Sequence, residues 1–293
     1  MVVITLKGGL GNQLFQYAFG RRIAIERNEQ LYFNIRPLIS NRNKATPRDF
    51  KLEGFPGTKI AGEEEVATFN DLYYGTHEAI IISDENTAKE NISSTINNPK
   101  VKAILLDGYF QDEFYFETCK ELIRDEIRSF LDQYYMKATL PANVVPANQE
   151  TVCIHLRRTD YLEPEKMLVH GICDLDYYEK ALDIIYSKLS DPHFYLFSDD
   201  PQEAEQLFDN ILANKTNVSA IMDKSPSKDN DLIELALMTR CKNFILANSS
   251  FSWWGSYLSD ADPKLVVAPT SWLLSEELSS RSVDIALQSW IRI

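Results

Sequence analysis

The sequence predicts an α/β protein whose C-terminal half forms a doubly wound parallel sheet. Short runs of β-branched and aromatic residues recur from residue 151 onward, and longer amphipathic segments separate them. This alternation is typical of βαβ units, in which crossover helices join parallel strands. The chain has 293 residues, of which 44% are apolar. It therefore has the material for one large domain or two medium ones.

The regular half is expected to contain five strands with helices between them. Apolar residues recur at helical spacing in segments 176–189 and 231–241. The expected strands span residues 151–156, 194–198, 218–222, 244–247 and 265–268. This succession predicts right-handed crossovers and a parallel sheet.

The first half is less regular. Its expected strands lie at 2–6, 31–33 and 101–106, and its expected helices at 12–27 and 113–131. Segment 36–100 gives weaker signals, because prolines and a polar run mark loops there. Segment 138–149 contains two prolines among small and polar residues and is expected to be a linker. We therefore expect domains at 1–140 and 150–293.

The charge of the chain excludes two classes of partner. The net charge is −13 and the sequence pI is about 4.8, so the chain lacks the basic field of general nucleic-acid binders and is repelled by anionic lipid. No apolar run approaches the roughly 20 residues of a membrane helix. We expect no nucleic acid as a partner and no integral membrane segment. Residues 1–60 nevertheless hold ten Lys and Arg against four acidic residues, which makes the start of the chain a separate, positive region.

The cysteines indicate a reducing compartment. None of the four forms a CxxC pair, so reduced thiols are expected rather than zinc binding or thiol exchange. The opening residues also lack the charged region and cleavage site of a secretory signal. We expect a cytoplasmic location.

The sequence HLRRTDY at 155–161 follows the first expected strand of the second half. The carboxyl ends of strands face the ligand crevice in an open α/β sheet, so His155, Arg157, Arg158 and Asp160 lie where site residues belong. Consecutive strand residues point to opposite faces. One arginine is therefore available for an anion while the other pairs with a structural carboxylate. Two solvated arginines at a strand end are the alternative, which explains neither the His nor the Asp.

A glycine-rich turn, KGGLGNQ at 7–13, joins the first expected strand to the first helix. Such turns let backbone amides approach a phosphate or a sugar near a helix N-terminus. The turn matches neither a Walker loop nor GxGxxG. A simple tight turn is the alternative, while Asn12 and Gln13 favour polar recognition.

Two further strand ends carry polar side chains. NSSFS at 248–252 places hydroxyls around a helix start, which favours an anion such as a diphosphate; helix capping followed by core packing is the alternative. SDD at 198–200 places carboxylates at another strand end. Asp199 or Asp200 could accept the paired donors of a guanine edge, or cap a helix.

Four motifs occur in order along the chain: GGLGNQLFQYA (8–18), GYFQ (108–111), HLRRTDY (155–161) and NSSFSWWGSYL (248–258). Together they resemble the bacterial α-1,2-fucosyltransferases of glycosyltransferase family 11, and they span almost the whole chain. The resemblance implies a GT-B-type fold, in which an acceptor-side domain and a Rossmann-like domain that binds GDP-fucose face a cleft. It also implies inversion at the anomeric carbon and no metal or other cofactor.

The resemblance also implies roles for the matching residues. Arg157 is expected to bind the β-phosphate of GDP and to stabilise the charge on the leaving nucleotide. His155 and Arg158 are expected to shape the same pocket, with Arg158 the structural member. Pyrophosphate contacts are expected from Ser250, Phe251 and Ser252, and a cleft wall from Gly9, Gly11 and Asn12. Guanine recognition by Asp199 or Asp200 is a weaker expectation.

The catalytic base is open at this stage. Inversion needs a group that takes the proton of the acceptor hydroxyl, and Asp160 is the first candidate. Glu163, Glu165 and Asp112 are alternatives, as is a phosphate oxygen in a mechanism with oxocarbenium character. Asp160 could instead hold an arginine in place. Thr159 stands where most family members have Gly, and Ser250 where many have Thr; neither change removes a charge or a donor.

The expected reaction is transfer of L-fucose from GDP-fucose to the 2-hydroxyl of a terminal β-galactoside glycan. A transferase for another GDP-sugar and a catalytically silent nucleotide-sugar or glycan-binding protein are the alternatives. Three D-x-D pairs could suggest a metal site, but so acidic a chain contains such pairs by chance. The acceptor is expected to be chosen by residues 36–100.

Overall fold

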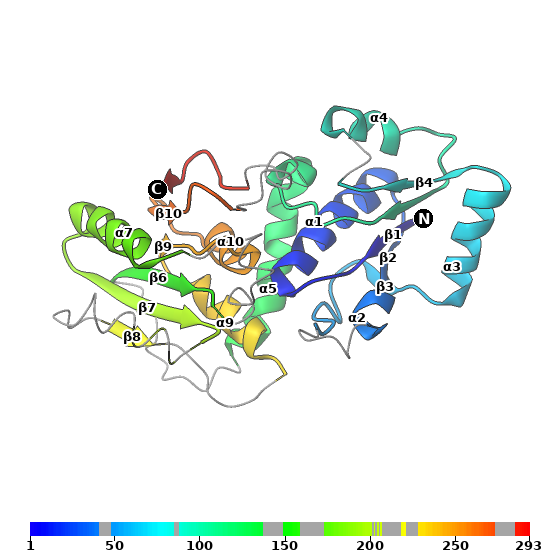
Figure 1. Cartoon of the computed structure of the whole chain (residues 1–293). Coiled ribbons are helices and arrows are strands. Elements are labelled where there is room, and N and C mark those ends of the chain that lie inside the picture. Colours follow the sequence, from blue (N-terminus) through cyan, green and yellow to red (C-terminus); the bar gives the residue numbers. More distant parts are fainter. Residues whose placement is uncertain are drawn as a thin grey trace. The chain divides into compact units, whose positions relative to one another are not determined.

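Two α/β units make up the chain in the computed structural model: Met1–Ile127 and Arg128–Ile293. The structure describes residues 1–40, 48–84, 88–136, 149–158, 173–200, 202, 204, 206, 218–220, 228–272 and 285–293. The expected linker at 138–149 lies outside these residues except for Gln149. Figure 1 shows each unit as parallel strands with helices packed against them.

The first unit is built on a five-stranded parallel sheet. Its strands are β1 (Val2–Thr5), β2 (Leu31–Asn34), β3 (Thr58–Ile60), β4 (Ala79–Ile82) and β5 (Ala103–Leu106). Their order in the sheet is β3-β2-β1-β5-β4. The direction of strand succession therefore reverses between β1 and β5, and ligands of open α/β sheets bind at such a switch point.

The helices of the first unit differ in how far they are buried. They are α1 (Leu10–Arg27), α2 (Arg36–Ser40), α3 (Glu63–Asn70), α4 (Ile92–Ile96) and α5 (Lys120–Tyr135), which continues into the second unit. Most of α1 is buried, so its apolar residues surround the helix rather than follow one stripe. α3 continues as one turn of π-helix, η1 (Asp71–Gly75), and exposes most of its surface.

One expectation for the first half was wrong in detail, and one weakly patterned segment proved to be structured. Segment 36–100, which gave only weak signals, contains α2, β3, α3, β4 and α4; these elements are three to eight residues long, too short for a clear periodic signal. The helix expected at 113–131 is interrupted. Short 3₁₀ turns at Glu113–Tyr115 and Glu117–Cys119 precede α5, because Asp112 accepts the Phe114 amide and tightens the chain there.

The second unit is the expected doubly wound parallel sheet. Its strands are β6 (Glu150–Leu156), β7 (Pro192–Ser198), β8 (Val218–Ala220), β9 (Asn243–Ile245), β10 (Val266–Ala268) and β11 (Ile291–Arg292). Their order is β11-β10-β9-β6-β7-β8, so the switch point lies between β6 and β9. All five expected strands are confirmed. The sixth, β11, has two residues, too few to show a pattern in the sequence.

Three helices of the second unit position its polar strand ends. They are α7 (Leu175–Lys188), α9 (Asn230–Met238) and α10 (Ser250–Leu258). α7 packs Tyr178, Ala181 and Ile185 on the core side of β6 and β7, and α10 buries Trp253 and Trp254 completely. Burying a large aromatic ring stabilises the fold by about 2–3 kcal/mol, so the start of α10 is firmly anchored.

All four cysteines are free thiols. Within the described ranges, none of the helices combines the length and the apolar character needed to cross a membrane.

Candidate active site

Three neighbouring strand ends carry the polar motifs of the second unit. β6 pairs with β7 on one side and with β9 on the other, both in parallel. Arg157 and Arg158 directly follow β6, Asp199 directly follows β7, and Ser249 lies four residues after β9. The HLRR, SDD and NSSFS motifs therefore share the carboxyl edge of one sheet, at its switch point, as expected from their places in the sequence.

Asp199, which follows β7, contacts both arginines. Its Oδ2 lies 3.1 Å from Nη1 of Arg157, and both side chains are 19% exposed. Its Oδ1 accepts a 2.8 Å hydrogen bond from the backbone amide of Arg158. The carboxylate thus fixes both the turn after β6 and the Arg157 guanidinium.

Arg158 is the buried member of the pair. Only 4% of the residue is exposed, and Nη1 donates a 2.9 Å hydrogen bond to the carbonyl of Cys173. Cys173 lies just before α7, whose first amides are capped by Asp174 through a 3.0 Å bond from the Tyr177 amide. The guanidinium therefore holds the entry to α7 against the end of β6.

His155 links the HLRR and NSSFS motifs. The residue is 3% exposed, and its ring centroid lies 5.8 Å from that of Phe251 in α10. Its carbonyl accepts a 2.9 Å hydrogen bond from the Tyr178 hydroxyl. Burial lowers the pKa of His155 to about 4; the positive charge of Arg157 acts in the same direction, and Asp199 opposes it. The imidazole is therefore neutral at pH 7.

The Nδ1 atom of His155 is buried and has no hydrogen-bond partner among the described residues. A buried polar atom of this kind costs free energy unless a partner is supplied. It lies at the strand end where the polar motifs meet.

The start of α10 offers backbone amides. Ser249 caps the helix, because its Oγ accepts the amide of Phe251 at 3.3 Å. Ser252 is completely buried, and its hydroxyl bonds to the carbonyls of Ala247 at 3.3 Å and Ser249 at 3.1 Å. Ser250 and Phe251 are partly exposed. The first turn contains no acidic residue, so the partial positive charge of the helix N-terminus is available to an anion.

The carboxyl edge of the first sheet is built around the glycine-rich turn. Gly8 has φ +79°, and a Cβ there would lie 2.4 Å from Nδ2 of Asn12, so only glycine fits. Gly9 is the N-cap residue of α1. A Cβ atom added at this position would have no neighbouring heavy atom within 4 Å. Gly11 is buried in the first turn. Asn12 Oδ1 accepts a 2.6 Å bond from Gln111, which joins the GGLGN and GYFQ motifs.

Gln13 holds the glycine turn against a neighbouring loop. It is fully buried. Its Nε2 donates to the carbonyls of Gly8 at 3.0 Å and Asp49 at 2.8 Å, and its Oε1 accepts the Lys51 amide at 3.0 Å. Sequence reasoning used Gln13 only as a hint of polar recognition. The apolar residues around Gln13 in the sequence of α1 are the feature that indicates an internal role.

Gln16 joins the two motif loops directly. It is also fully buried. Its Oε1 accepts the amide of Lys7 at 3.1 Å, and its Nε2 donates to the carbonyl of Gly108 at 3.2 Å. Lys7 follows β1 and Gly108 follows β5, so this one side chain bridges the switch point of the first sheet. Sequence reasoning missed it, although a Gln three residues after Gln13 lies on the same helix face.

Charged side chains also stabilise this edge. Lys7 Nζ lies 3.0 Å from Oδ1 of Asp107 and 5.3 Å from the centroid of the Tyr109 ring. Asp84 accepts the amides of Tyr109 at 2.5 Å and Phe110 at 3.0 Å. The GYFQ segment is thus fixed by a carboxylate from the end of β4.

Of the four carboxylates considered as the catalytic base, the structure describes Asp112. Asp112 accepts the Phe114 amide at 2.8 Å through Oδ1 and pairs with Lys89 through Oδ2, so it stabilises the turn before α5. Asp160, Glu163 and Glu165 lie outside the described residues, and the role of base stays a prediction for them.

Three of the D-x-D aspartates have structural partners. Asp174 caps α7, Asp176 pairs with Lys180 at 2.6 Å, and Asp260 pairs with Arg128. No group of three or more His, Cys, Asp and Glu side chains suited to a metal ion occurs in the part of the chain that the structure describes.

Known proteins resemble the chain over almost its full length. It is 29% identical to an α-1,2-colitosyltransferase of Escherichia coli over 299 residues, covering 100% of this chain and 99% of the relative. It is 28% identical to the O-antigen biosynthesis glycosyltransferase WbnK of Escherichia coli over 308 residues, covering 98% and 99%.

A solved structure shares the fold. The NodZ α-1,6-fucosyltransferase soaked with GDP-fucose matches with a TM-score of 0.51 and 16% identity, covering 88% of this chain and 92% of that one. The fold is therefore of the expected GT-B type. The family model for glycosyl transferase family 11 matches residues 76–293, which is most of the chain and includes three of the four motifs. The chain belongs to glycosyl transferase family 11.

Proposed function

We propose that the chain is an inverting glycosyltransferase that moves L-fucose from GDP-fucose to the 2-hydroxyl of a terminal β-galactoside. The observation that carries the proposal is the contact between His155 and Phe251, which brings the arginine motif and the start of α10 together at one strand edge. An arginine at the same strand edge as a helix N-terminus that has no acidic residue in its first turn is an arrangement that suits a diphosphate. Membership of family 11 and the motif resemblance support the α-1,2 linkage.

In this proposal Arg157 binds the β-phosphate and stabilises the charge that develops as GDP leaves. Arg157 exchanges part of its pairing with Asp199 for the phosphate, since that carboxylate lies 3.1 Å away. Both Asp199 oxygens already have partners, so guanine recognition by Asp199 or Asp200 stays a prediction. The partly exposed Ser250 and the α10 amides contact the pyrophosphate, while buried Ser252 holds the turn.

That the glycine turn takes part in the donor site stays a prediction from the motif resemblance. Gly9 leaves open space at its Cβ position, which allows a sugar or diphosphate to approach the backbone closely. Gly11 and Asn12 support the same turn. We propose Asp160 as the base that takes the acceptor proton. We also propose that Arg157 and the helix amides neutralise the leaving group without a metal ion, and that the enzyme acts in the cytoplasm.

A second donor deserves a direct comparison, because one full-length relative is a colitosyltransferase. Colitose is fucose without its 3-hydroxyl, so the two GDP-sugars present the same diphosphate. Discrimination between them depends on whether a protein group bonds the 3-hydroxyl, since a site built to bond a hydroxyl strongly rejects the analogue that lacks it.

The test supplies GDP-fucose, GDP-colitose and GDP-mannose separately with lactose and a panel of galactosides, in EDTA. We expect turnover with GDP-fucose, release of GDP, and a product whose linkage is α-1,2 by NMR. Turnover with GDP-colitose but not with GDP-fucose would show that GDP-colitose, rather than GDP-fucose, is the donor. Binding of GDP-sugars without turnover on any galactoside would favour the silent binding protein, and loss of turnover in EDTA would contradict metal independence.

A further inference from the structure

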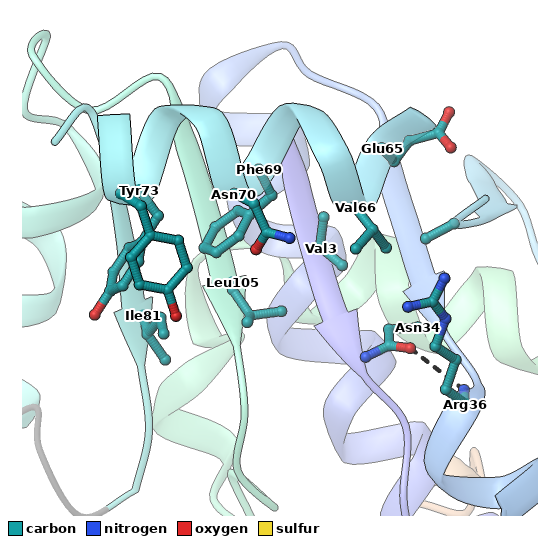
Figure 2. Close-up of a pocket in the computed structure, with 12 residues that line it drawn as sticks. Val3, Asn34, Arg36, Glu65, Val66, Phe69, Asn70, Tyr73, Ile81 and Leu105 are labelled. Carbon is teal, nitrogen blue, oxygen red and sulfur yellow. Dashed lines mark hydrogen bonds between the residues drawn. The ribbon is translucent and has the colours of Figure 1, made fainter. Parts of the chain in front are cut away.

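A cavity of about 190 Å³ lies in the first unit, between α3 with its π-helical turn and the sheet (Figure 2). Its floor is a row of side chains from three neighbouring strands, since Val3 pairs with Leu105 and Leu105 pairs with Ile81 in register. Val66 and Phe69 descend from α3 toward this row. This volume is many times the roughly 10–15 Å³ that one water molecule needs, so the space admits a group larger than a few water molecules.

Aromatic rings form one end of the cavity. Phe69 stacks on Tyr73 with centroids 5.8 Å apart and an interplanar angle of 16°. Tyr74 meets Tyr73 edge-on at 5.0 Å and is 74% exposed. An exposed tyrosine beside an apolar floor offers a ring face to a ligand, and its hydroxyl can hydrogen-bond a polar edge of the same ligand.

Ala61 and four planar polar side chains form the rest of the lining. The polar side chains have complementary chemistry. They are Asn34, Arg36, Glu65 and Asn70. The backbone amide of Arg36 donates a 3.3 Å hydrogen bond to Asn34 Oδ1. The carboxylate of Glu65 accepts a 2.8 Å hydrogen bond from the Gly62 amide. Within the described ranges, the Arg36 guanidinium and the Asn70 amide bond no other side chain. One positive and one negative side chain leave the lining without net charge.

We propose that this cavity binds one neutral pyranose ring of the acceptor glycan, a ring other than the galactose that receives the fucosyl group. A pyranose has an apolar C–H face and a rim of hydroxyls, which match the apolar floor with its tyrosines and the amide, guanidinium and carboxylate groups. The single carboxylate does not suit a divalent cation. The balanced charge does not suit a diphosphate. This inference rests on the proposed function, because it assigns the cavity to the acceptor.

The cavity adjoins the edge that carries the glycine turn. Asn34 ends β2, and its Nδ2 donates to Oγ1 of Thr5 at 3.3 Å. Thr5 ends β1, two residues before Lys7 and the turn. In this proposal the ring in the cavity and the reacting galactose belong to one glycan, and the cavity selects the sugar that precedes the terminal galactose.

Two variants test the assignment. Ala61→Leu places a larger side chain into the cavity, and Asn70→Ala removes an exposed amide from its lining. Thr68→Ala is the matched control, because Thr68 is also exposed on α3 but does not line the cavity. KM and kcat are measured with GDP-fucose and two acceptors, methyl β-galactoside and lacto-N-tetraose.

We expect both variants to raise KM for lacto-N-tetraose about tenfold, which corresponds to about 1.4 kcal/mol. Their kcat values and their KM for methyl β-galactoside should stay at the wild-type level, as should every constant of the control. Unchanged KM for both acceptors, or equal changes for both, would overturn the assignment while leaving the proposed function intact.

Direct binding separates the two proposals. Saturation-transfer NMR with lacto-N-tetraose and no donor reports contact with the inner rings. If no acceptor turns over but the tetrasaccharide signal appears in the wild type and disappears in Ala61→Leu, the cavity binds a pyranose ring, while the transferase proposal and the description of that glycan as an acceptor both fail. Absence of that signal in the wild type contradicts the cavity assignment.

Discussion

The carboxyl edges of the two sheets are stabilised by different chemistry. In the second unit an ion pair between Arg157 and Asp199 and a buried arginine hold the strand ends together. In the first unit two fully buried glutamines hold the glycine turn with neutral amide hydrogen bonds, while the charged groups of that edge are the partly exposed Lys7–Asp107 pair and the Asp84 carboxylate. Of these two edges, only the one proposed to bind the diphosphate therefore carries a buried positive charge among the described residues, and neutral side chains hold the glycine turn. The same topological position is proposed to bind an anion in one unit and to present a backbone-lined surface in the other.

The largest expected effect comes from removing the charge at the second edge. Arg157→Ala should lower kcat by about 100- to 1000-fold, or about 2.7–4 kcal/mol, as for the loss of one donor to a developing anion. Arg157→Lys should recover part of the rate, because it restores the charge without the two-pronged guanidinium.

The measurement for Arg157 is steady-state kinetics with GDP-fucose, together with Tm. The control is Arg240→Ala, which removes a different arginine of the same unit that pairs with Asp132. A rate near that of wild type in Arg157→Ala, with unchanged Tm, would mean that the second edge does not stabilise the leaving group.

A second effect of similar size concerns stability and pH at the same edge. Burial lowers the pKa of His155 to about 4 in the folded state, against about 6.5 in an unfolded chain. Between these two values the folded state binds fewer protons than the unfolded chain. The free energy of unfolding is therefore highest, with respect to His155, above about pH 6.5, and it decreases as the pH falls toward 4. The maximum loss is about 3 kcal/mol at about 1.36 kcal/mol for each unit.

Urea unfolding at several pH values between 4 and 7 measures this loss. His155→Gln should give a flatter dependence of the free energy of unfolding on pH, whatever its own stability. His77→Asn, at an exposed position, should keep the wild-type slope. If wild type and His155→Gln have the same slope, the neutral buried imidazole is not part of the folded state.

The smallest of the three effects separates the two edges. Gln16→Ala should lower the free energy of unfolding by about 1–3 kcal/mol, because the buried Lys7 amide and Gly108 carbonyl lose their partner. Affinity for GDP should fall much less than in Arg157→Ala, since the change lies at the first edge. Calorimetric titration of GDP and urea unfolding measure the two quantities. A GDP affinity that falls as far as in Arg157→Ala would show that the first edge holds the nucleotide as strongly as the second.

Much of the fold and the convergence of the polar motifs at one sheet edge could be predicted from the sequence. The alternation after residue 151 predicted five parallel strands, and a parallel sheet gathers their carboxyl ends at one edge. The HLRR, SDD and NSSFS motifs follow β6, β7 and β9. Their convergence therefore follows from local sequence and topology. The short elements of segment 36–100 could not be predicted, because three to eight residues give no reliable period and their packing decides their structure.

The sequence by itself determined which residues stand at the strand ends and which turn needs glycine. Only the tertiary structure decided their partners. Asp199 pairs with Arg157, and Gln16 bonds both Lys7 and Gly108, which lies 92 residues further along the chain than Gln16; the cavity under α3 joins Val3, Ile81 and Leu105. Strand order and register bring these residues together. Both result from burying the apolar faces of the sheet and its helices together, and no local pattern records that.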